Sequence, residues 1–473
     1  MLNLAPKPNG TFRIVHQLDP CDSLIYTALV REICESVEQY RIPESENIAC
    51  SYRIKPNIDG SFFSTDTGWD TYINQTTYLS DEFKTGWVIA ADITDFYNQI
   101  YTHRIKGLIE ESGNGTYDQQ ARIIEDFLLS LNKRTSRGIP VGPIPSIILA
   151  ELIMASIDKK ILEYTNKFVR YVDDIRIYFN KVEDAVNCLH DLTLYLHNFH
   201  RLVFSGEKTE IIPVNRFLEK YMEDEEKAEK AALVAKANEL AHEKMDDFVK
   251  NLPPYHADFD YKEEYEKTLA SIVGEKRLEL IASTYYELFQ KALALPRDYG
   301  LLRHLIRQAT RYRIRNIIPL LLDNFYSIRP VIREAIIYLN AVINDRTIFT
   351  YKAKFERLYS SFFLKLPFIN LWVSHLLHNV NFNKIGLPSN YDRIINIRGQ
   401  ALMSLRKKDT TWVRSHRDSI DMLGPWDKRA VLYSTLILPL DEMQPFVRTY
   451  TSSDDIIEKS IASFILSKKK SLK

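Results

Sequence analysis

Two short apolar runs in the first half of the chain each end at aspartate. Residues 87–91 (WVIAA) precede Asp92, and residues 168–172 (FVRYV) precede Asp173 and Asp174. A short apolar run bounded by polar residues is typical of a strand. We therefore predict two apolar strands, with carboxylates at the rigid point where each strand ends.

The pattern changes near residue 220. Residues 219–252 are rich in charge and alanine, carry apolar residues at helical spacing, and are followed by Pro253 and Pro254. They predict a solvated helical linker, and a helix that binds a partner is the alternative. Helical spacing without a convincing strand run then predicts helices at residues 276–293, 301–311, 317–325, 330–343 and 426–436. The expected domains are therefore 1–220, a helical linker at 221–268, and an all-α domain at 269–473.

Two of the predicted helices share a plan. Residues 330–339 (PVIREAIIYL) and 425–434 (PWDKRAVLYS) each open with proline, continue with basic residues, and place alanine where helices pack closely. This plan is typical of degenerate HEAT-type helical hairpins, which stack on one another and leave a curved surface for partners. An irregular helical bundle is the alternative.

Carboxylates at two strand ends are suited to divalent cations. Asp92 and Asp173 would hold two Mg²⁺ ions about 3.5–4 Å apart, and Mn²⁺ would serve as a substitute. One ion would activate an attacking 3′-hydroxyl and the other would neutralise the leaving pyrophosphate, which is the chemistry of a nucleotidyl transferase. The alternative is structural, because an Asp-Asp pair after an apolar run is common at hairpin turns.

Three motifs in order favour the chemical interpretation. Residues 92–103 read DITDFYNQIYTH, residues 137–158 read RGIPVGPIPSIILAELIMASID, and residues 170–179 read RYVDDIRIYF. This set resembles motifs A, B and C of the reverse-transcriptase palm. The resemblance implies an α+β fold, with a right-hand fingers–palm domain followed here by the all-α, HEAT-like helical-repeat domain.

The resemblance also implies roles for single residues. Asp92 and Asp173 would bind both metal ions with help from the backbone carbonyl of Ile93, and Asp174 would support them. Tyr97 would be the aromatic gate that packs under the sugar and excludes a 2′-hydroxyl, which implies deoxynucleoside triphosphates as substrates. An aromatic residue at this position could equally belong to the core.

Lys208 follows a helix predicted at residues 192–204, in a turn at residues 205–210 that resembles motif D. There it would be the general acid that protonates the leaving pyrophosphate, and a solvated surface lysine is the alternative. Further nucleotide-binding residues are expected from the resemblance: Lys7 and Arg13 of a fingers hairpin at residues 6–15, together with Asp95, Phe96, Val141 and Gly142.

Val141 and the charge distribution point away from ordinary templated synthesis. Members of the family that copy templates usually have Gln where this chain has Val141. Residues 1–220 hold 23 Lys+Arg against 30 Asp+Glu, whereas the remainder holds 39 against 32. A polymerase that clamps a long duplex needs a basic groove, because phosphate contacts replace released counterions. The acidic catalytic half argues against such a clamp.

The details narrow the resemblance to the bacterial abortive-infection (Abi) and related defence-associated reverse transcriptases. The narrower resemblance rests on the short palm, the GIPVGP string with Ser146 and Ala150-Glu151-Leu152 after it, YVDD, and the long helical half. This group implies antiphage DNA synthesis without a template, a single-stranded DNA product attached to a tyrosine of the protein, and a homo-oligomer of three or six subunits. The priming tyrosine cannot be carried over, because no matched motif contains it.

Two alternatives remain from the sequence. One is a retron-like enzyme that copies a noncoding RNA bound to the basic half. The other is a scaffold whose palm senses nucleotides while the helical half binds a phage or host protein. Intact Asp92 and Asp173 disfavour the scaffold.

Composition adds the cellular context. The four cysteines, Cys21, Cys34, Cys50 and Cys188, show no metal-ligand spacing and are expected to be reduced and buried. No apolar run reaches the roughly 18 residues of a membrane span, and no signal peptide precedes the fingers-like segment. The expected location is the cytoplasm, without a membrane partner.

Overall fold

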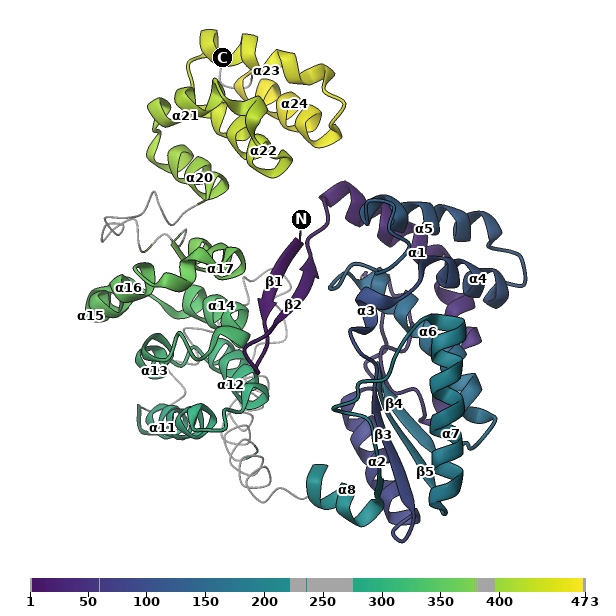
Figure 1. Ribbon diagram of the computed structural model, residues 1–473. Helices are drawn as coiled ribbons and strands as arrows, with labels where there is room; N and C mark the ends of the chain where they lie inside the picture. The colour runs from purple at the N-terminus through teal and green to yellow at the C-terminus, as the bar shows by residue number, and fades with distance from the viewer. Residues whose placement is uncertain are drawn as a thin grey trace, which may run out of the picture. The chain divides into compact units, whose positions relative to one another are not determined.

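The computed structural model describes residues 2–58, 60–221, 275–377 and 396–470, together with Ala235, Asn379 and Asn381. The chain divides into two compact units: Met1–Asn3 with Ile14–Glu225, and Leu4–Arg13 with Glu226–Lys473. Figure 1 traces both units along the chain. The linker predicted at residues 221–268 lies, apart from Tyr221 and Ala235, outside the described residues.

An antiparallel sheet forms the centre of the first unit. Its order is β4 (Phe168–Tyr171), β5 (Asp174–Phe179), β3 (Trp87–Asp92) and β6 (Glu210–Pro213). Along β3, Ile89 and Ala91 belong to the main hydrophobic core, whereas Val88 and Ala90 belong to a second core on the opposite face. Burial on both faces explains the unbroken apolar runs, and both predicted strands are confirmed.

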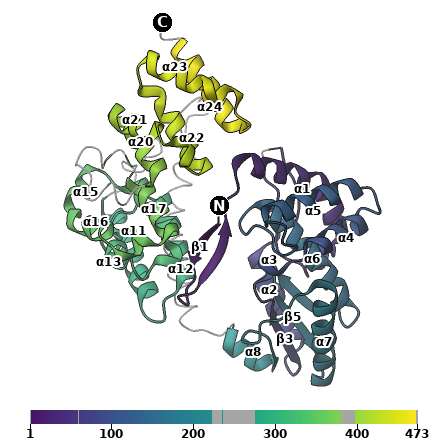
Figure 2. The ribbon, with the colours of Figure 1, turned by 45° about the horizontal axis from the view of Figure 1, so that its top comes forward.

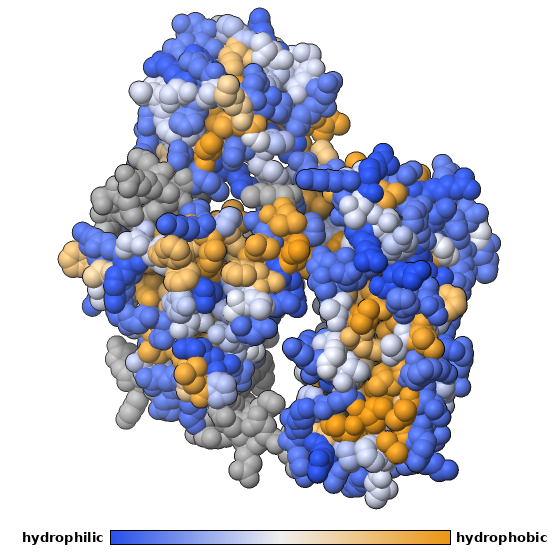
Figure 3. Space-filling view, in the orientation of Figure 1, coloured by the Kyte–Doolittle hydropathy of each residue, from blue (hydrophilic) through white to orange (hydrophobic). Residues whose placement is uncertain are grey.

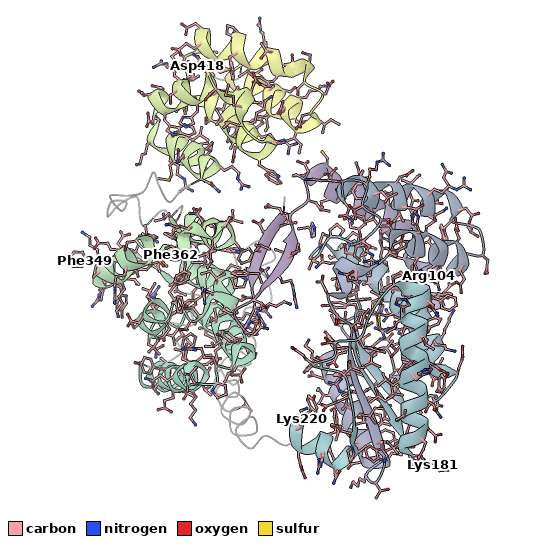
Figure 4. The ribbon with its side chains drawn as sticks, viewed as in Figure 1. Arg104, Lys181, Lys220, Phe349, Phe362 and Asp418 are labelled. Carbon is pink, nitrogen blue, oxygen red and sulfur yellow. The ribbon has the colours of Figure 1, made fainter. Side chains whose placement is uncertain are left out.

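Helices cover the two faces of this sheet (Figures 1 and 2). The main core includes α6 (Ile144–Leu162) and α7 (Val182–Tyr195), and α6 is apolar around most of its circumference because it is buried along nearly its whole length. The second core includes α2 (Trp69–Glu82) and α8 (Val214–Tyr221). Lys220 at the end of α8, labelled in Figure 4, lies 2.6 Å from the Glu210 carboxylate of β6.

The helices of the fingers contribute to the main core, and those at Pro20–Tyr40 and Thr102–Ser112 pack against α6. The fingers helices are α1 (Pro20–Tyr40), α3 (Phe96–Gln99), α4 (Thr102–Ser112) and α5 (Asp118–Leu131), and a 3₁₀ turn at Glu44–Glu46 follows α1. The carboxylate of Asp19 caps α1 by accepting a 3.2 Å hydrogen bond from the Cys21 N–H, and Pro20 occupies the first turn. Arg104 of α4 donates to the Ser156 hydroxyl of α6 at 3.0 Å.

The fingers hairpin predicted at residues 6–15 is present as β1 (Leu2–Pro6) and β2 (Phe12–His16). The Lys7 N–H donates to the Thr11 carbonyl at 2.8 Å, and Gly10 takes a positive φ of 84° in the turn. Glycine adopts this left-handed backbone without steric cost.

The second unit is built from helices that form two separate cores. The first set is α11 (Glu275–Leu293), α12 (Tyr299–Arg311), α13 (Ile318–Asp323), α14 (Ile332–Val342), α15 (Asp345–Thr350), α16 (Lys352–Tyr359) and α17 (Pro367–Leu377). The second set is α20 (Ile397–Lys407), α21 (Thr410–Arg417), α22 (Pro425–Ser434), α23 (Leu440–Thr449) and α24 (Ile456–Lys470). Residues 275–377 and 396–470 contain no strand, and all five predicted helices are present with ends shifted by a few residues. HEAT-type stacking remains a prediction.

The helix predicted at residues 192–204 is wrong in its bounds. The observed helix α7 begins at Val182, continues into a π-helical turn at Leu196–His200, and ends where Arg201 adopts a left-handed backbone with φ of 56°. Phe204 then pairs with Ile93 as an antiparallel bridge. Burial of His200 and pairing with the chain beyond β3 therefore override the helical pattern of this segment.

Surface hydropathy is mixed on both units (Figure 3). Apolar side chains reach the surface among hydrophilic ones, and the most exposed include Leu24, Phe349, Phe362 and Met422. Phe349 and Phe362 are labelled in Figure 4. No helix among the described residues is long and apolar enough to cross a bilayer.

Candidate active site

The two predicted carboxylate strands pair directly. β3 and β5 run antiparallel, and their register places Asp92 opposite Asp174. Asp173 occupies the tight turn between β4 and β5, next to Val172, which has a positive φ of 56°. The structure therefore brings Asp92, Asp173 and Asp174 to one end of the sheet, although they lie in motifs far apart in sequence.

The surroundings of Asp173 disfavour its negative charge. Burial and the neighbouring charges of Asp92 and Asp174 raise the pKa of Asp173 to about 6, against the opposing effects of its own backbone N–H and of Lys208. Three carboxylates that repel one another at a partly buried strand end are a donor set that a divalent cation would stabilise. Among the described residues, however, no group of three or more His, Cys, Asp or Glu side chains is arranged closely enough to hold a metal ion without rearrangement.

Asp174 differs from its neighbour because it has a cationic partner. Burial also raises the pKa of Asp174, but the Arg176 guanidinium, which forms an ion pair with this carboxylate, opposes the shift. Asp174 is thus held by the protein, whereas Asp173 has no arginine of its own among the described ion pairs. This contrast fits the supporting role that the resemblance implies for Asp174.

Lys208 reaches the site from the turn after Phe204. Its Nζ lies 2.9 Å from Oδ2 of Asp92, and 66% of its side chain is exposed. The Ser205 N–H donates to the Asp92 carbonyl at 2.8 Å, and the Thr209 hydroxyl accepts from the Asp92 N–H at 3.4 Å. The predicted turn is therefore fixed to Asp92 at both ends, which positions Lys208 beside the carboxylates.

Ile93 was predicted to assist the metals through its carbonyl. It is buried and pairs with Phe204, and the flanking hydrogen bonds of this bridge use the carbonyls of Asp92 and Val203 as acceptors. The described pairing is thus compatible with a metal-binding role for the Ile93 carbonyl, which remains a prediction.

Tyr97 lies on α3, which follows β3 in the chain. Its ring is partly exposed and packs against the main core. Burial raises the pKa of the phenol well above its ordinary value, and the carboxylates of Glu151 and Asp173 raise it further. Tyr97 is therefore neutral and close to the carboxylates. Its position is compatible both with a gate under the sugar and with a core residue.

The side chains of Asp95 and Phe96 are less available than that of Tyr97 for direct contact with a nucleotide. The Phe96 ring is 2% exposed and contacts Tyr97 edge-on, with 5.6 Å between ring centroids. Asp95 has a positive φ of 48°, and its carboxylate accepts from the Asn98 amide at 2.7 Å. Any contact from Phe96 to a triphosphate would have to use its backbone.

Motif B begins at a turn that packs on α3. Gly138 has a positive φ of 89°, and a Cβ at this position would lie 3.2 Å from the Asn98 carbonyl oxygen. Val141 exchanges two hydrogen bonds with His16 at the end of the fingers hairpin: its N–H donates to His16 Nδ1 at 3.1 Å, and its carbonyl accepts from the His16 N–H at 3.0 Å. Gly142 follows with φ of 121°. Both backbone hydrogen-bonding groups of Val141 are therefore occupied by His16.

Lys7 and Arg13 belong to the fingers hairpin at residues 6–15. Both lie in the segment Leu4–Arg13, which groups with the second unit rather than with the palm. Their predicted contact with a triphosphate therefore remains a prediction.

The structure also contains a buried charge network next to the turn that carries Asp173, and the sequence did not predict this network. Glu151 of α6 lies between two arginines, accepting from Arg41 at 2.9 Å and from Arg170 at 3.0 Å, and Arg170 forms a two-bonded pair with Asp158 at 2.8 Å. All four side chains are at most 3% exposed. The signal was present, since charged residues interrupt the apolar runs of motifs B and C, but the sequence does not show which charges meet.

Comparison with known proteins supports the motif assignment. Residues 5–229 match the family described as Reverse transcriptase (RNA-dependent DNA polymerase). Solved structures that are similar include telomerase from Candida albicans in complex with a TWJ fragment of telomeric RNA, with 11% identity, a TM-score of 0.34, and coverage of 78% of this chain and 63% of that one.

Two structures of telomerase from Candida tropicalis are similar to the same degree. The complex with a TWJ fragment of telomeric RNA has 12% identity, a TM-score of 0.35, and coverage of 83% and 63% of the two chains. The apo form has 10% identity, a TM-score of 0.31, and coverage of 85% and 65%. The chain thus spans less than two thirds of these proteins, and no curated protein matches its sequence. Motif order, sheet register and family match together establish that this chain contains a reverse transcriptase domain.

Proposed function

We propose that this chain is an antiphage-defence DNA polymerase of reverse-transcriptase type, which adds deoxynucleotides without a template to a tyrosine of the protein itself. The observation that carries the catalytic part is the register of β3 and β5, which places Asp92 opposite Asp174 and beside Asp173. The Abi resemblance of motif B and of the long helical half supports the biological part.

Asp92 and Asp173 are the residues that would hold Mg²⁺, and Asp174 would assist them. When bound, the ions would supply charge neutralisation at the attacking hydroxyl and at the leaving pyrophosphate. The raised pKa of Asp173 means that this carboxylate must lose its proton before it can bind a cation. While Asp173 loses its proton and binds a cation, the ion pair with Arg176 would keep the Asp174 carboxylate in place.

Lys208 would serve as the acid for the leaving group. Its ion pair with Asp92 is exposed, and exposed pairs contribute only about 0–1 kcal/mol, so the ammonium can leave Asp92 at little cost when a cation arrives. Because Lys208 sits on a turn hydrogen-bonded to Asp92, it stays within reach of the reacting phosphates after it moves.

The surroundings of motif B support synthesis without a gripped template. Val141 presents a short apolar side chain, and both its backbone hydrogen-bonding groups are used by His16. A polymerase that does not grip a duplex needs another way to keep the growing 3′ end near Asp92 and Asp173. Covalent attachment to the protein supplies one, since tethering gives effective concentrations roughly in the mM range. A ring of three or six subunits would enclose the growing strand.

The test uses the purified full-length chain with Mg²⁺ and labelled deoxynucleotides as the only additions. We expect DNA that stays with the protein through denaturation and is released by protease but not by RNase. An Asp173→Asn protein is the control for contaminating polymerase. Activity that is lost after RNase treatment and returns with one specific RNA would contradict the proposal and favour the RNA-templated enzyme.

A further inference from the structure

The backbone beside Asp173 adopts a conformation that its sequence disfavours. Val172 has a φ of 56°, in the left-handed region, which is a genuine outlier for a β-branched residue. Such a conformation persists only where surrounding contacts enforce it, and these positions cluster at functional sites. The two-residue turn between β4 and β5 requires a positive φ at its first residue, and contacts to the turn would hold Val172 there against the preference of valine for negative φ.

Two partly buried hydrogen bonds hold Val172, one to its N–H and one to its carbonyl. The Val172 carbonyl accepts from the Arg170 guanidinium at 2.9 Å, and the Val172 N–H donates to the Ser51 hydroxyl at 2.9 Å. Ser51 is fully buried, and its hydroxyl donates in turn to Glu151 at 2.6 Å. Ser51 belongs to the segment before α2, far from motif C in sequence.

A second left-handed residue is held by the same network. Tyr52 has a φ of 45°, and its carbonyl accepts from Arg41 at 2.9 Å, while the Ser51 carbonyl accepts from Arg41 at 2.7 Å. Arg41 and Arg170 share one oxygen of Glu151. The two strained turns are therefore connected through a single buried carboxylate and through the Ser51 hydroxyl.

The segment carrying Ser51 is also bonded to the strand that leads to the turn. The Arg170 N–H donates to the Ile48 carbonyl at 2.8 Å, and the Cys50 N–H donates to the Arg170 carbonyl at 2.9 Å, which forms a parallel bridge. Residues 48–51 thus follow β4 and deliver the Ser51 hydroxyl to the end of the strand. There the hydroxyl accepts from the N–H of Val172, the residue before Asp173.

We propose that Ser51 is a positioning residue, which fixes the left-handed turn at Val172 and thereby the orientation of the Asp173 carboxylate. The proposal rests on the proposed polymerase function of this site. Ser51 does not touch substrate; it acts through the Val172 amide. Of the groups that hold the turn, it is the one that can be removed without stranding a buried charge, because Arg41, Arg170 and Asp158 keep their partners when the hydroxyl is lost.

The test compares Ser51→Ala with Ser80→Ala in the full-length chain. Ser80 is a matched control, because it is also fully buried and its hydroxyl lies 3.0 Å from the Tyr178 hydroxyl, in the core on the other face of the sheet. We expect Ser51→Ala to lower kcat for deoxynucleotide incorporation about tenfold or more, with KM within about twofold, since small misplacement of a reacting group is costly. Ser80→Ala should leave kcat unchanged. Equal kcat in Ser51→Ala and wild type, or equal loss in both variants, would overturn the proposal.

Two further measurements separate positioning from simple loss of stability. Glycine adopts positive φ without cost, so adding Val172→Gly to Ser51→Ala should recover most of the lost kcat, whereas a loss that this change leaves untouched counts against the proposal. Hydrogen exchange does not depend on activity: a peptide covering residues 168–176 should exchange faster in Ser51→Ala and not in Ser80→Ala. If the wild-type protein incorporates no nucleotide, the proposed function fails, and unchanged exchange in Ser51→Ala would overturn the positioning role separately.

Discussion

The ammonium of Lys208 lies 2.9 Å from the carboxylate of Asp92, although 116 positions separate the two residues in sequence. The turn that carries Lys208 bonds to both the N–H and the carbonyl of Asp92. The Asp92 carboxylate and a potential proton donor are therefore part of one local structure, and the Lys208 side chain is exposed enough to move.

We predict that Lys208→Ala lowers kcat for nucleotide incorporation on the order of a hundredfold, as expected when a general acid is removed. Lys208→Arg should lower kcat nearly as much, because arginine keeps the charge but does not readily give up a proton. Lys84→Ala is the control and should leave kcat unchanged, since the Lys84 side chain is also exposed, at 68%, and its Nζ also lies near a carboxylate, 3.2 Å from Asp81. If kcat of the Lys208→Arg protein equals that of wild type, the positive charge alone is needed, and Lys208 is not the general acid.

The second prediction concerns pH and the stability of the metal-free protein. The folded-state pKa of Asp173 is about 6, above the ordinary carboxyl value, so the folded state binds more protons than the unfolded state between about pH 4 and 6. Stability from this group is therefore lost as pH rises through that window. Asp173→Asn should raise the free energy of unfolding by about 1–2 kcal/mol near neutral pH, and the gain should disappear at about pH 4.

Denaturant unfolding of both proteins in a chelating buffer would measure this difference. A variant that is less stable than wild type near neutral pH would show that the Asp173 carboxylate makes a favourable contact in the fold rather than a repulsive one.

The third prediction concerns sugar selection. Tyr97→Ala should increase the use of ribonucleotides relative to deoxynucleotides about tenfold or more while total activity falls, because specificity that depends on steric exclusion is lost with the excluding atoms. Tyr117→Ala is the control, since Tyr117 is also a partly buried tyrosine packed against the main core. If competition assays show the same sugar preference in Tyr97→Ala and wild type, Tyr97 is a core residue.

The carboxylate strands could be predicted from sequence because their information is local. Each apolar run ends at aspartate, and burial on both faces leaves a continuous pattern. The pairing of Asp92 with Asp174 could not be predicted locally, because strand register depends on partners about 80 residues away. The resemblance to the palm implied only that these carboxylates and Lys208 serve one site, and not which residues pair across the strands.

The remaining features depend on tertiary contacts that override local preference. No residue near Arg201 is a typical helix-ending residue. The helix nevertheless ends at Arg201, because His200 is buried and Phe204 pairs with Ile93. Val172 likewise takes positive φ in the two-residue turn between β4 and β5, where Ser51 and Arg170 bind its backbone. Glu151 on an apolar helix predicted no particular partner, since a buried carboxylate is tolerated only where arginines from other elements reach it.

The most direct test of the central claim is deoxynucleotide incorporation by proteins in which single carboxylates are replaced. With Mg²⁺ present, Asp92→Asn and Asp173→Asn should each reduce incorporation by about a thousandfold or more while circular dichroism shows an intact fold, because each removes a ligand of the catalytic metals. Asp174→Asn should cost less, since Arg176 already pairs with that carboxylate. Asp81→Asn, at an exposed carboxylate on α2, should match wild type. Incorporation by a homogeneous Asp173→Asn protein at the wild-type rate would contradict the account.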